Sequence, residues 1–234
     1  MSSPRMSRET ASRYRVTFSK TVEMRYTSHL DLQRTWERLM RRAELPLLFT
    51  EGFHPRVRFN LAAALPLGFT GDAEICDLYL TERIEPAALC ERLRRSAPPG
   101  VDVRSLCEVP SLGPAVQTLI RSADYVVDAD DVDADAVVAR VEALLAAREL
   151  PRERRGKVYD LRPLVESLST ERVGMGVRIR ATLSCRPGAT GRPDELLDAL
   201  GLEPLAARVC RTRLVLDDEP GEGAEISRTE SAGA

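Results

Sequence analysis

The order in which strand and helix patterns follow one another constrains the fold of this chain more than any other feature, because the same series occurs twice. Residues 13–19 alternate between apolar side chains and Arg13, Arg15 and Thr17, which is the period of a half-buried strand. The patterns that follow are a helix, two strands, a helix and a strand, at residues 28–43, 56–62, 75–80, 85–95 and 101–109.

The second half repeats this series after the linker "PSLGPAV". Its patterns are a strand, a helix, two strands, a helix and a strand, at residues 118–129, 133–147, 154–163, 174–184, 192–202 and 207–216. We interpret residues 164–172, between the two middle strands, as a loop or a helical turn. The sequence therefore predicts an α+β fold of two tandem ferredoxin-like (β-α-β-β-α-β) units with antiparallel sheets. The units are expected at 13–110 and 116–216, between a disordered N-terminus at 1–12 and an acidic disordered tail at 217–234.

Composition and the termini indicate where the protein works. With 43% hydrophobic and 30% charged residues among 234, the chain has the composition of a soluble globular protein. No apolar run approaches the roughly 20 residues of a membrane span, and the N-terminus "MSSPRMSRETAS" lacks the apolar region of a secretory signal. We expect a cytoplasmic protein that does not bind a membrane.

The five cysteines do not form a recognisable site. None belongs to a C-x-x-C pair, so the sequence predicts neither a disulfide framework nor a metal centre built from this chain alone. Motifs for nucleotide phosphates, G-x-G-x-x-G and G-x-x-x-x-G-K-[ST], are also absent. We therefore expect no metal and no cofactor in this chain.

Charge is unevenly distributed along the chain. Residues 13–60 hold nine arginines and Lys20 against five acidic residues, a net charge of +5. Residues 217–230 hold six acidic residues against Arg228, a net charge of −5. A basic front favours a polyanion or an acidic partner, although lysine is rare throughout, so part of the arginine excess is a general bias of composition.

The helix predicted at residues 28–43 begins with "SHLD". Ser28 is a natural N-cap, and Asp31, three residues later, completes a capping box with aspartate in place of glutamate. Apolar residues recur at helical spacing on one side, and the opposite side carries four arginines, namely Arg34, Arg38, Arg41 and Arg42. This face is either a solvated charged surface or a surface that binds phosphate, for which the arginine fork is well suited.

The basic surface is expected to extend beyond this helix. Arg13 and Arg15, and further along Arg56, Arg58 and Asn60, alternate with apolar residues and are expected on the open face of the sheet. RNA-recognition domains stack bases on aromatic residues of that face. Because arginines occupy these positions here, we predict contacts to a nucleic-acid backbone and no stacking on the sheet.

Lys20, His29 and His54 lie where predicted loops meet predicted helices or strands. A lysine and a histidine at such turns are candidates for general acid–base catalysis on RNA or another substrate. The alternative is that they orient a loop or bind an anion. A histidine at a helix N-terminus is also pushed towards its neutral form.

Several motifs resemble one known family. The stretches "FSKTVEMRYTSHLDLQRTWERLMRRAELPL", "TEGFHPRVRF", "ALPLG" and "AEICDLYL" resemble the radical-SAM-linked domain family, a bacterial domain of unknown function, and the resemblance covers roughly residues 13–215. The sequence departs from the family pattern at Val22, where glycine is usual, and at His54, where asparagine is usual.

The resemblance implies partners. Members are typically encoded beside, or fused to, a radical SAM protein, and some neighbour a ribonuclease of the E/G type. This chain lacks the C-x-x-x-C-x-x-C motif of the radical enzyme. The partner enzyme would therefore carry the iron–sulfur cluster and S-adenosylmethionine.

These observations lead to three functional hypotheses. The first is an accessory protein of a radical SAM enzyme, without catalytic activity of its own, that holds RNA or another anionic substrate on a basic face of the first unit. The second is an RNA-processing or RNA-modifying enzyme that uses His29 and Lys20. The third is a purely protein-binding module. The candidate binding residues are Lys20, Ser28, His29, Asp31, Arg34, Arg38, Arg41, Arg42, His54, Arg56 and Arg58.

Overall fold

The computed structural model describes residues 11–154 and 156–217, and it has an α+β fold. The predictions for residues 1–10 and 218–234 lie outside the described residues. The helices and strands of the first half are β1 (Ser12–Lys20), α1 (His29–Arg42), β2 (Phe59–Leu61), β3 (Thr70–Leu80), α2 (Pro86–Ser96) and β4 (Val101–Val109). Those of the second half are β5 (Ile120–Ala129), α3 (Ala134–Ala146), β6 (Pro151–Arg154), β7 (Lys157–Asp160), β8 (Val165–Val173), β9 (Gly176–Arg186), β10 (Ala189–Thr190), α4 (Pro193–Ala199) and β11 (Arg208–Leu216).

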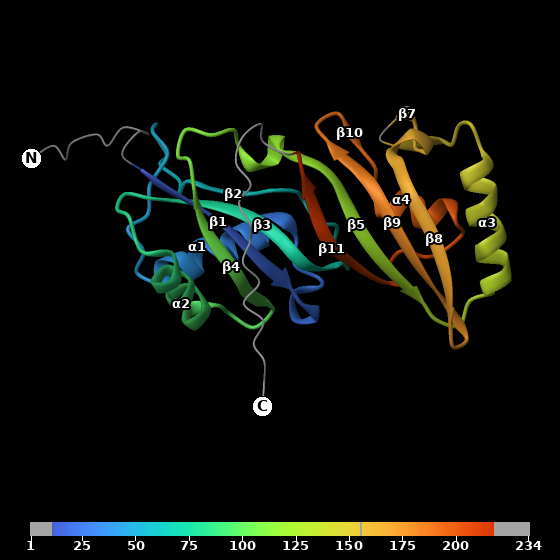
Figure 1. Cartoon of the computed structure of the whole chain (residues 1–234), viewed down its shortest axis with the longest axis horizontal. Helices are drawn as coiled ribbons and strands as arrows, with labels where there is room; N and C mark the ends of the chain where they lie inside the picture. The colour runs from blue at the N-terminus through green and yellow to red at the C-terminus, as the bar shows by residue number, and fades with distance from the viewer. Residues whose placement is uncertain (1–10, 155, 218–234) are drawn as a thin grey trace, which may run out of the picture.

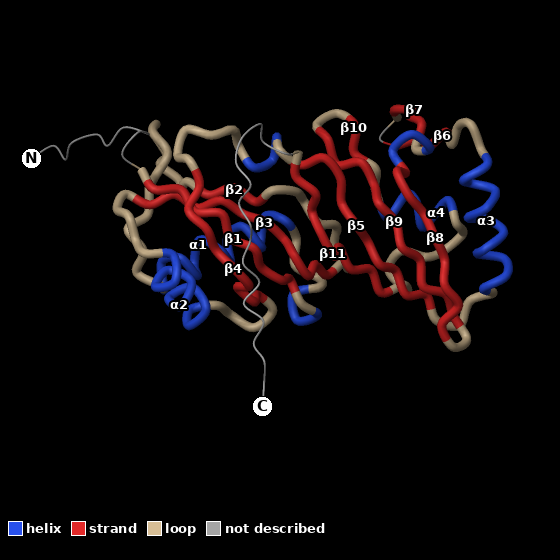
Figure 2. The backbone as a smooth tube through the Cα atoms, in the orientation of Figure 1, coloured by secondary structure: helices blue, strands red, loops and turns tan. Residues whose placement is uncertain are grey.

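Nine strands form one mixed sheet that runs through both halves (Figure 2). Its order is β10-β9-β5-β11-β3-β1-β4, with β2 paired to β3 and β8 paired to β9. The halves are joined by β11 and β3, which pair in parallel at Cys210 with Thr70 and at Arg211 with Gly71. The prediction of purely antiparallel sheets is therefore wrong at this seam, because β11, the last of the described strands, adds to the part of the β3 edge that β2 leaves unpaired.

Figure 1 shows α1 and α2 at one end of this sheet and α3 at the other. Within the first half the strands pair in the order β4-β1-β3-β2, and within the second half in the order β11-β5-β9-β8, all antiparallel. The hairpin of β6 and β7 forms a separate two-stranded sheet between α3 and β8.

Two middle segments differ from the prediction. Residues 164–172, expected as a loop or helical turn, fall almost entirely in β8, which pairs with β9 from Val165 with Leu183 to Val173 with Gly176. The segment "VESLSTERV" is polar because only Val165 and Leu168 of this edge strand are buried. The strand predicted at 154–163 is replaced by the hairpin and a short 3-10 helix, Arg162–Leu164. The strand expected at 56–62 is shortened to β2.

The core of the first half lies between the sheet and α1 and α2. The predicted apolar stripe of α1 is buried through Leu32, Trp36, Leu39 and Met40. The Trp36 ring meets the Phe18 ring edge-on at 4.9 Å and stacks on that of Phe59 at 5.6 Å. These contacts anchor α1 on the sheet and hold its polar side outward.

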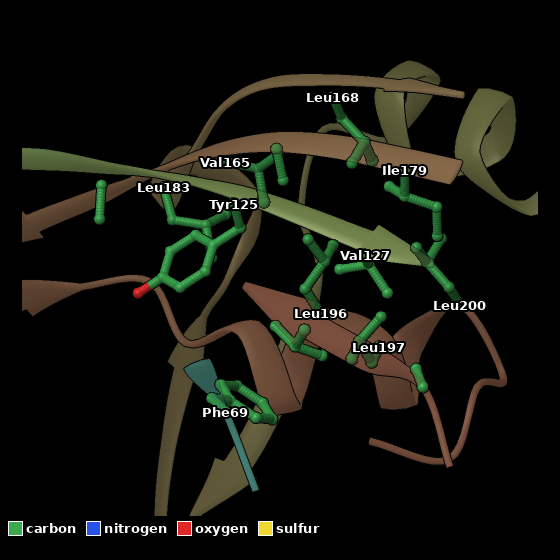
Figure 3. Close-up of a cluster of buried hydrophobic side chains, with 14 of the residues drawn as sticks. Phe69, Tyr125, Val127, Val165, Leu168, Ile179, Leu183, Leu196, Leu197 and Leu200 are labelled. Atoms are coloured by element: carbon green, nitrogen blue, oxygen red, sulfur yellow. The ribbon is translucent and has the colours of Figure 1, made fainter. Parts of the chain in front are cut away.

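A second core joins α3 and α4 to the sheet of the second half (Figure 3). Val127, Ile179 and Leu183 of the strands pack with Leu196 and Leu197 of α4. Phe69, from the loop before β3, also packs into this core. The two halves therefore share apolar contacts in addition to the strand pairing. Within the described residues, no helix combines the length and apolar character needed to cross a bilayer.

Candidate functional site

A group of titratable side chains lies at the start of α1, where the two halves meet. Lys20 of β1 and Arg211 of β11 both lie opposite Gly71 of β3, one on each side. On β3 an extra residue interrupts the register, since Phe18 faces Glu74 and Lys20 already faces Gly71. Such a bulge re-aims side chains, and here it brings Glu74 over Gly71, where an added Cβ atom would lie 2.7 Å from Glu74 Cγ. We call Lys20, His29, Glu74 and Arg211 the junction cluster.

Glu74 and Arg211 form a buried, two-pronged ion pair. Arg211 Nε donates to Glu74 Oε1 at 2.8 Å, and Arg211 Nη2 donates to Oε2. The other Arg211 donors reach the carbonyl oxygens of Ala63 and Ala64, at 3.1 and 3.0 Å. Burial opposes the charge of Arg211, but Glu74 and the neighbouring Tyr125 outweigh it and raise the pKa of Arg211. This pair therefore locks β11 to β3.

Lys20 is fully buried beside this pair. Its Nζ atom donates to the carbonyl oxygens of Phe69 at 3.1 Å and Arg25 at 3.3 Å. Burial lowers the pKa of Lys20, Glu74 partly offsets this and Arg211 adds to it, so that the resulting pKa is about 8. Lys20 is therefore close to a mixed protonation state at neutral to mildly alkaline pH, which is uncommon for lysine.

His29 is the first residue of α1 and is half-buried. Burial lowers its pKa, as does Arg211, while Glu74 acts in the opposite direction. The structure thus places the two sequence-predicted candidates for acid–base chemistry around one ion pair, with His29 neutral at pH 7. Across residues 11–154 and 156–217, no three His, Cys, Asp or Glu side chains are arranged to hold a metal ion.

Ser28 and Asp31 are occupied by the start of α1. Ser28 is the N-cap, as predicted, and its hydroxyl accepts from the Asp31 backbone N–H at 3.2 Å and donates to the Asp31 carboxylate at 2.8 Å. Asp31 also accepts from Arg34 at 3.0 Å. The Ser28 hydrogen bond, with Arg34 and Arg38 nearby, lowers the pKa of Asp31. These contacts explain the "SHLD" motif as a helix start.

The outward side of α1 joins α2 to form a basic surface. Two adjoining hollows, of about 160 and 320 Å³, share Arg42; the first is also lined by Arg38 and the second by Arg92 and Arg95 of α2. Glu44 is the one acidic residue that lines them. We call this surface the arginine face; it consists of Arg34, Arg38, Arg41, Arg42, Arg92 and Arg95.

The arginines of this face differ in how they are held. Arg92 donates to the Ala43 and Glu44 carbonyl oxygens, both at 2.7 Å from Nη2, and so caps the C-terminus of α1. Arg42 donates to Ser96 O at 3.3 Å. Within the described part of the chain, Arg38 and Arg95 form no hydrogen bond or ion pair shorter than 4 Å, so their guanidinium groups are available to an anion.

The open sheet face differs from the prediction. Arg13 is buried, not exposed, because Asp77 of β3 accepts from its Nε at 3.0 Å and the linker covers it through Gly113 O at 3.0 Å. Arg15 donates to the same carboxylate at 2.9 Å. Arg58 stacks on the Tyr79 ring at 4.3 Å on this face. The arginines here serve a structural ion-pair cluster, and Arg58 lies away from the arginine face.

His54 and Arg56 lie on an exposed loop next to α1. Residues 50–56 are exposed throughout, and Phe53 is fully exposed at 103% of its reference area. At the base of the loop, Arg41 of α1 lies over the Phe49 ring at 5.6 Å. The loop therefore adds aromatic surface beside the arginine face.

Sequence reasoning missed Glu74 and Arg211 of the junction cluster and Arg92 and Arg95 of the arginine face. A signal existed for the first pair, because each charge interrupts an apolar strand, in "AEICDLYL" and "VCRTRLVL". Their contact, across 137 residues of sequence, could not be read from either strand alone. For the second pair the signal was "ERLRR", which repeats the basic character of α1.

Comparison with known proteins identifies the family of this chain. No curated protein matches this sequence. A crystal structure of an unknown protein from Galdieria sulphuraria aligns with 85% of this chain and 96% of its own, at 13% identity and a TM-score of 0.25, which is too low to establish a common fold. The profile of a family described as "Uncharacterized protein conserved in bacteria (DUF2344)" matches residues 13–193. Since this match covers most of the chain, the protein belongs to the DUF2344 family.

Proposed function

We propose that this protein is an accessory protein of a radical SAM enzyme and that it holds RNA on the arginine face. The observation that carries the RNA-binding part is the pair of adjoining hollows between α1 and α2, lined by four arginines and one acidic residue. Arginine recognises phosphate through two parallel hydrogen bonds. Arg38 and Arg95 have no competing hydrogen bond within the described residues, so binding requires no internal contact to be broken.

Phe53 favours single-stranded RNA over other polyanions. Its ring is fully exposed on the loop whose base, at Phe49, contacts Arg41 of the arginine face, and bases of single strands stack on such rings. Stacking on the sheet itself was not expected, and the loop supplies this function from a different place.

We infer that each half is a ferredoxin-like unit. The strand orders β4-β1-β3-β2 and β11-β5-β9-β8, with helices between strands, support this assignment. RNA-recognition domains use the same arrangement, but this likeness is an analogy of fold and does not carry function.

The radical SAM partner rests on the sequence resemblance alone. In this proposal the partner supplies the iron–sulfur cluster and S-adenosylmethionine, and a ribonuclease of the E/G type is a further candidate partner. Co-purification of the tagged full chain from its native cell, with and without ribonuclease treatment, tests both. Recovery of neither protein would remove this part of the proposal and leave RNA binding to be judged separately.

RNA binding is tested by fluorescence anisotropy with a labelled single-stranded RNA across a salt series. We expect Arg38→Gln/Arg95→Gln to weaken binding and to reduce the slope of log K against log [salt] by about 1.4, because two phosphate contacts are lost at about 0.7 each. The control Arg121→Gln/Arg148→Gln removes the same charge from exposed positions of the second half. An equal loss in both variants, or no RNA binding by the wild type, would contradict the proposal and favour a purely protein-binding module.

The second candidate is an RNA-processing or RNA-modifying enzyme centred on His29. The observation that favours it is the junction cluster, since pKa values shifted by burial and specific charges are typical of active sites. Lys20 is 1% exposed, so it would act through His29 and not on a substrate directly. In this case His29→Gln would abolish turnover of RNA while leaving its affinity unchanged.

A further inference from the structure

A hollow of about 600 Å³ lies in the second half, between the β6–β7 hairpin, β10 and the start of α4. In Figure 1, β7 and β10 lie at the same edge of the molecule, far from α1 and α2. We call it the hairpin hollow; its lining includes Arg154, Lys157, Tyr159, Leu164, Thr190 and Arg192. The volume is that of ordinary small-molecule sites.

Three cations line this hollow, and two of them, Arg154 and Lys157, have no matching acid among the described residues. Arg154 and Lys157 lie directly opposite each other in the hairpin, an arrangement that is unfavourable for like charges. Neither forms an ion pair with the residues that the structure describes. The one acidic side chain of the lining, Asp160, uses Oδ1 to accept from the Leu150 and Arg162 backbone N–H groups, at 2.7 and 3.0 Å. The hairpin therefore keeps a concentration of positive charge that an anion would relieve.

Two polar atoms at the hollow lack partners. The Tyr159 hydroxyl and Arg192 Nε are buried and have no hydrogen bond within residues 11–154 and 156–217. Arg192 is paired with Asp194, since its Nη2 donates to Asp194 Oδ2 at 3.4 Å. Its Nε, however, lies 3.3 Å from Asp194 Oδ1 without being aligned for a hydrogen bond, and that oxygen is also unsatisfied. A buried polar group without a partner destabilises the fold by about 1–3 kcal/mol. Such atoms beside a hollow indicate that a bound ligand supplies their missing hydrogen-bond partners.

The rest of the lining is suited to a flat, weakly polar group. It includes the Tyr159 ring, Leu164 and the backbone turn at Gly188 and Ala189. We propose that the hairpin hollow binds a mononucleotide, with its phosphate on Arg154, Lys157 and Arg192 and its base against Tyr159 and Leu164. This inference does not depend on RNA binding by the arginine face, because it uses different residues in the other half of the chain.

The test is calorimetric titration of the full chain with each of the four ribonucleoside 5′-monophosphates, with inorganic phosphate and adenosine as partial ligands. We expect at least one nucleotide to bind more tightly than either partial ligand. Arg154→Gln and Lys157→Gln should each raise its Kd about tenfold, the size of one charge-assisted contact. Tyr159→Phe should raise it about threefold, through loss of one neutral hydrogen bond.

Two controls make the result specific. Arg121→Gln, an exposed change outside the hollow, and Arg38→Gln/Arg95→Gln on the arginine face should leave the Kd unchanged. Lys157→Gln should also raise the melting temperature of the free protein, since it removes the repulsion between Arg154 and Lys157 across the hairpin. Such a rise would also show that the variant is folded. The inference is overturned if no nucleotide binds at millimolar concentration, if phosphate alone binds equally well, or if the arginine-face variant and not the hairpin variants weakens binding.

Discussion

The ion pair between Glu74 and Arg211 offers the sharpest test of how this molecule is held together. Glu74 accepts two hydrogen bonds from a guanidinium group that is 1% exposed, and both residues lie on the seam between the halves. Glu74→Gln keeps the size and shape of the side chain but removes its charge. The Arg211 guanidinium then stays buried with two carbonyl oxygens and no counter-charge.

The expected loss follows from this burial. Removing one partner of a buried ion pair destabilises a protein by about 3–5 kcal/mol, because the other charge remains uncompensated. For a chain of this size, each kcal/mol lowers the melting temperature by about 2–4 °C. Glu74→Gln should therefore lower it by about 6–20 °C.

Urea unfolding followed by Trp36 fluorescence measures this loss, since Trp36 is the single tryptophan and is fully buried. The matched control is Asp130→Asn, which removes the charge of a carboxylate paired with Arg208 where both side chains are 60% exposed. An exposed pair contributes about 0–1 kcal/mol. The two variants should therefore differ severalfold in their loss of stability.

A second measurement tests the electrostatics of the same site. Glu74 raises the pKa of His29 while Arg211 lowers it, so Glu74→Gln should lower the His29 pKa further in an NMR titration. If Glu74→Gln loses no more stability than Asp130→Asn and the His29 pKa is unchanged, the Glu74–Arg211 pair does not stabilise the seam between the halves.

Three further predictions concern single side chains. Burial lowers the Lys20 pKa from 10.5 to about 8, so between these pH values the unfolded chain binds more protons than the folded protein. The wild type should therefore gain up to about 3 kcal/mol of stability relative to Lys20→Met as pH rises from 8 to 10.5, measured by urea unfolding. Parallel plots of stability against pH for the two proteins would contradict this. Gly71→Ala should displace Glu74 and destabilise the chain by about 1–3 kcal/mol, whereas Gly174→Ala, a turn with open space around it, should leave the Glu74 contacts and the His29 pKa intact. Phe53→Ala should weaken single-stranded RNA binding by about 1–3 kcal/mol and leave heparin binding unchanged in the same anisotropy assay; equal loss for both ligands would remove the stacking argument.

Local patterns predicted the first half of the fold well, because they depend on neighbouring residues. Alternation placed β1, and the spacing of Leu32, Trp36, Leu39 and Met40 gave the buried side of α1. Ser28 marked the helix start correctly. Alternation failed for β8, because an edge strand buries only a few of its side chains and "VESLSTERV" reads as a polar loop.

Long-range pairing explains the other differences. Arg13 alternates correctly as a residue of the polar face, but it is buried because Asp77, 64 residues later in the sequence, accepts its hydrogen bonds. The junction cluster depends on a bulge in β3 and on a strand from the far end of the chain. Neither feature leaves a periodic signal, so His29 and Lys20 could be singled out from the sequence, whereas the ion pair between Glu74 and Arg211 could not.

The central position of β11 has a consequence for how the protein is made. This strand is synthesised last among the described elements, yet it lies between β5 and β3 in the middle of the sheet. Until it leaves the ribosome, the first half presents an open β3 edge and a Glu74 carboxylate without its guanidinium partner. A ribosome that stops before the codon of Arg208 would therefore release a chain missing the centre of its sheet, with two open strand edges available to aggregate.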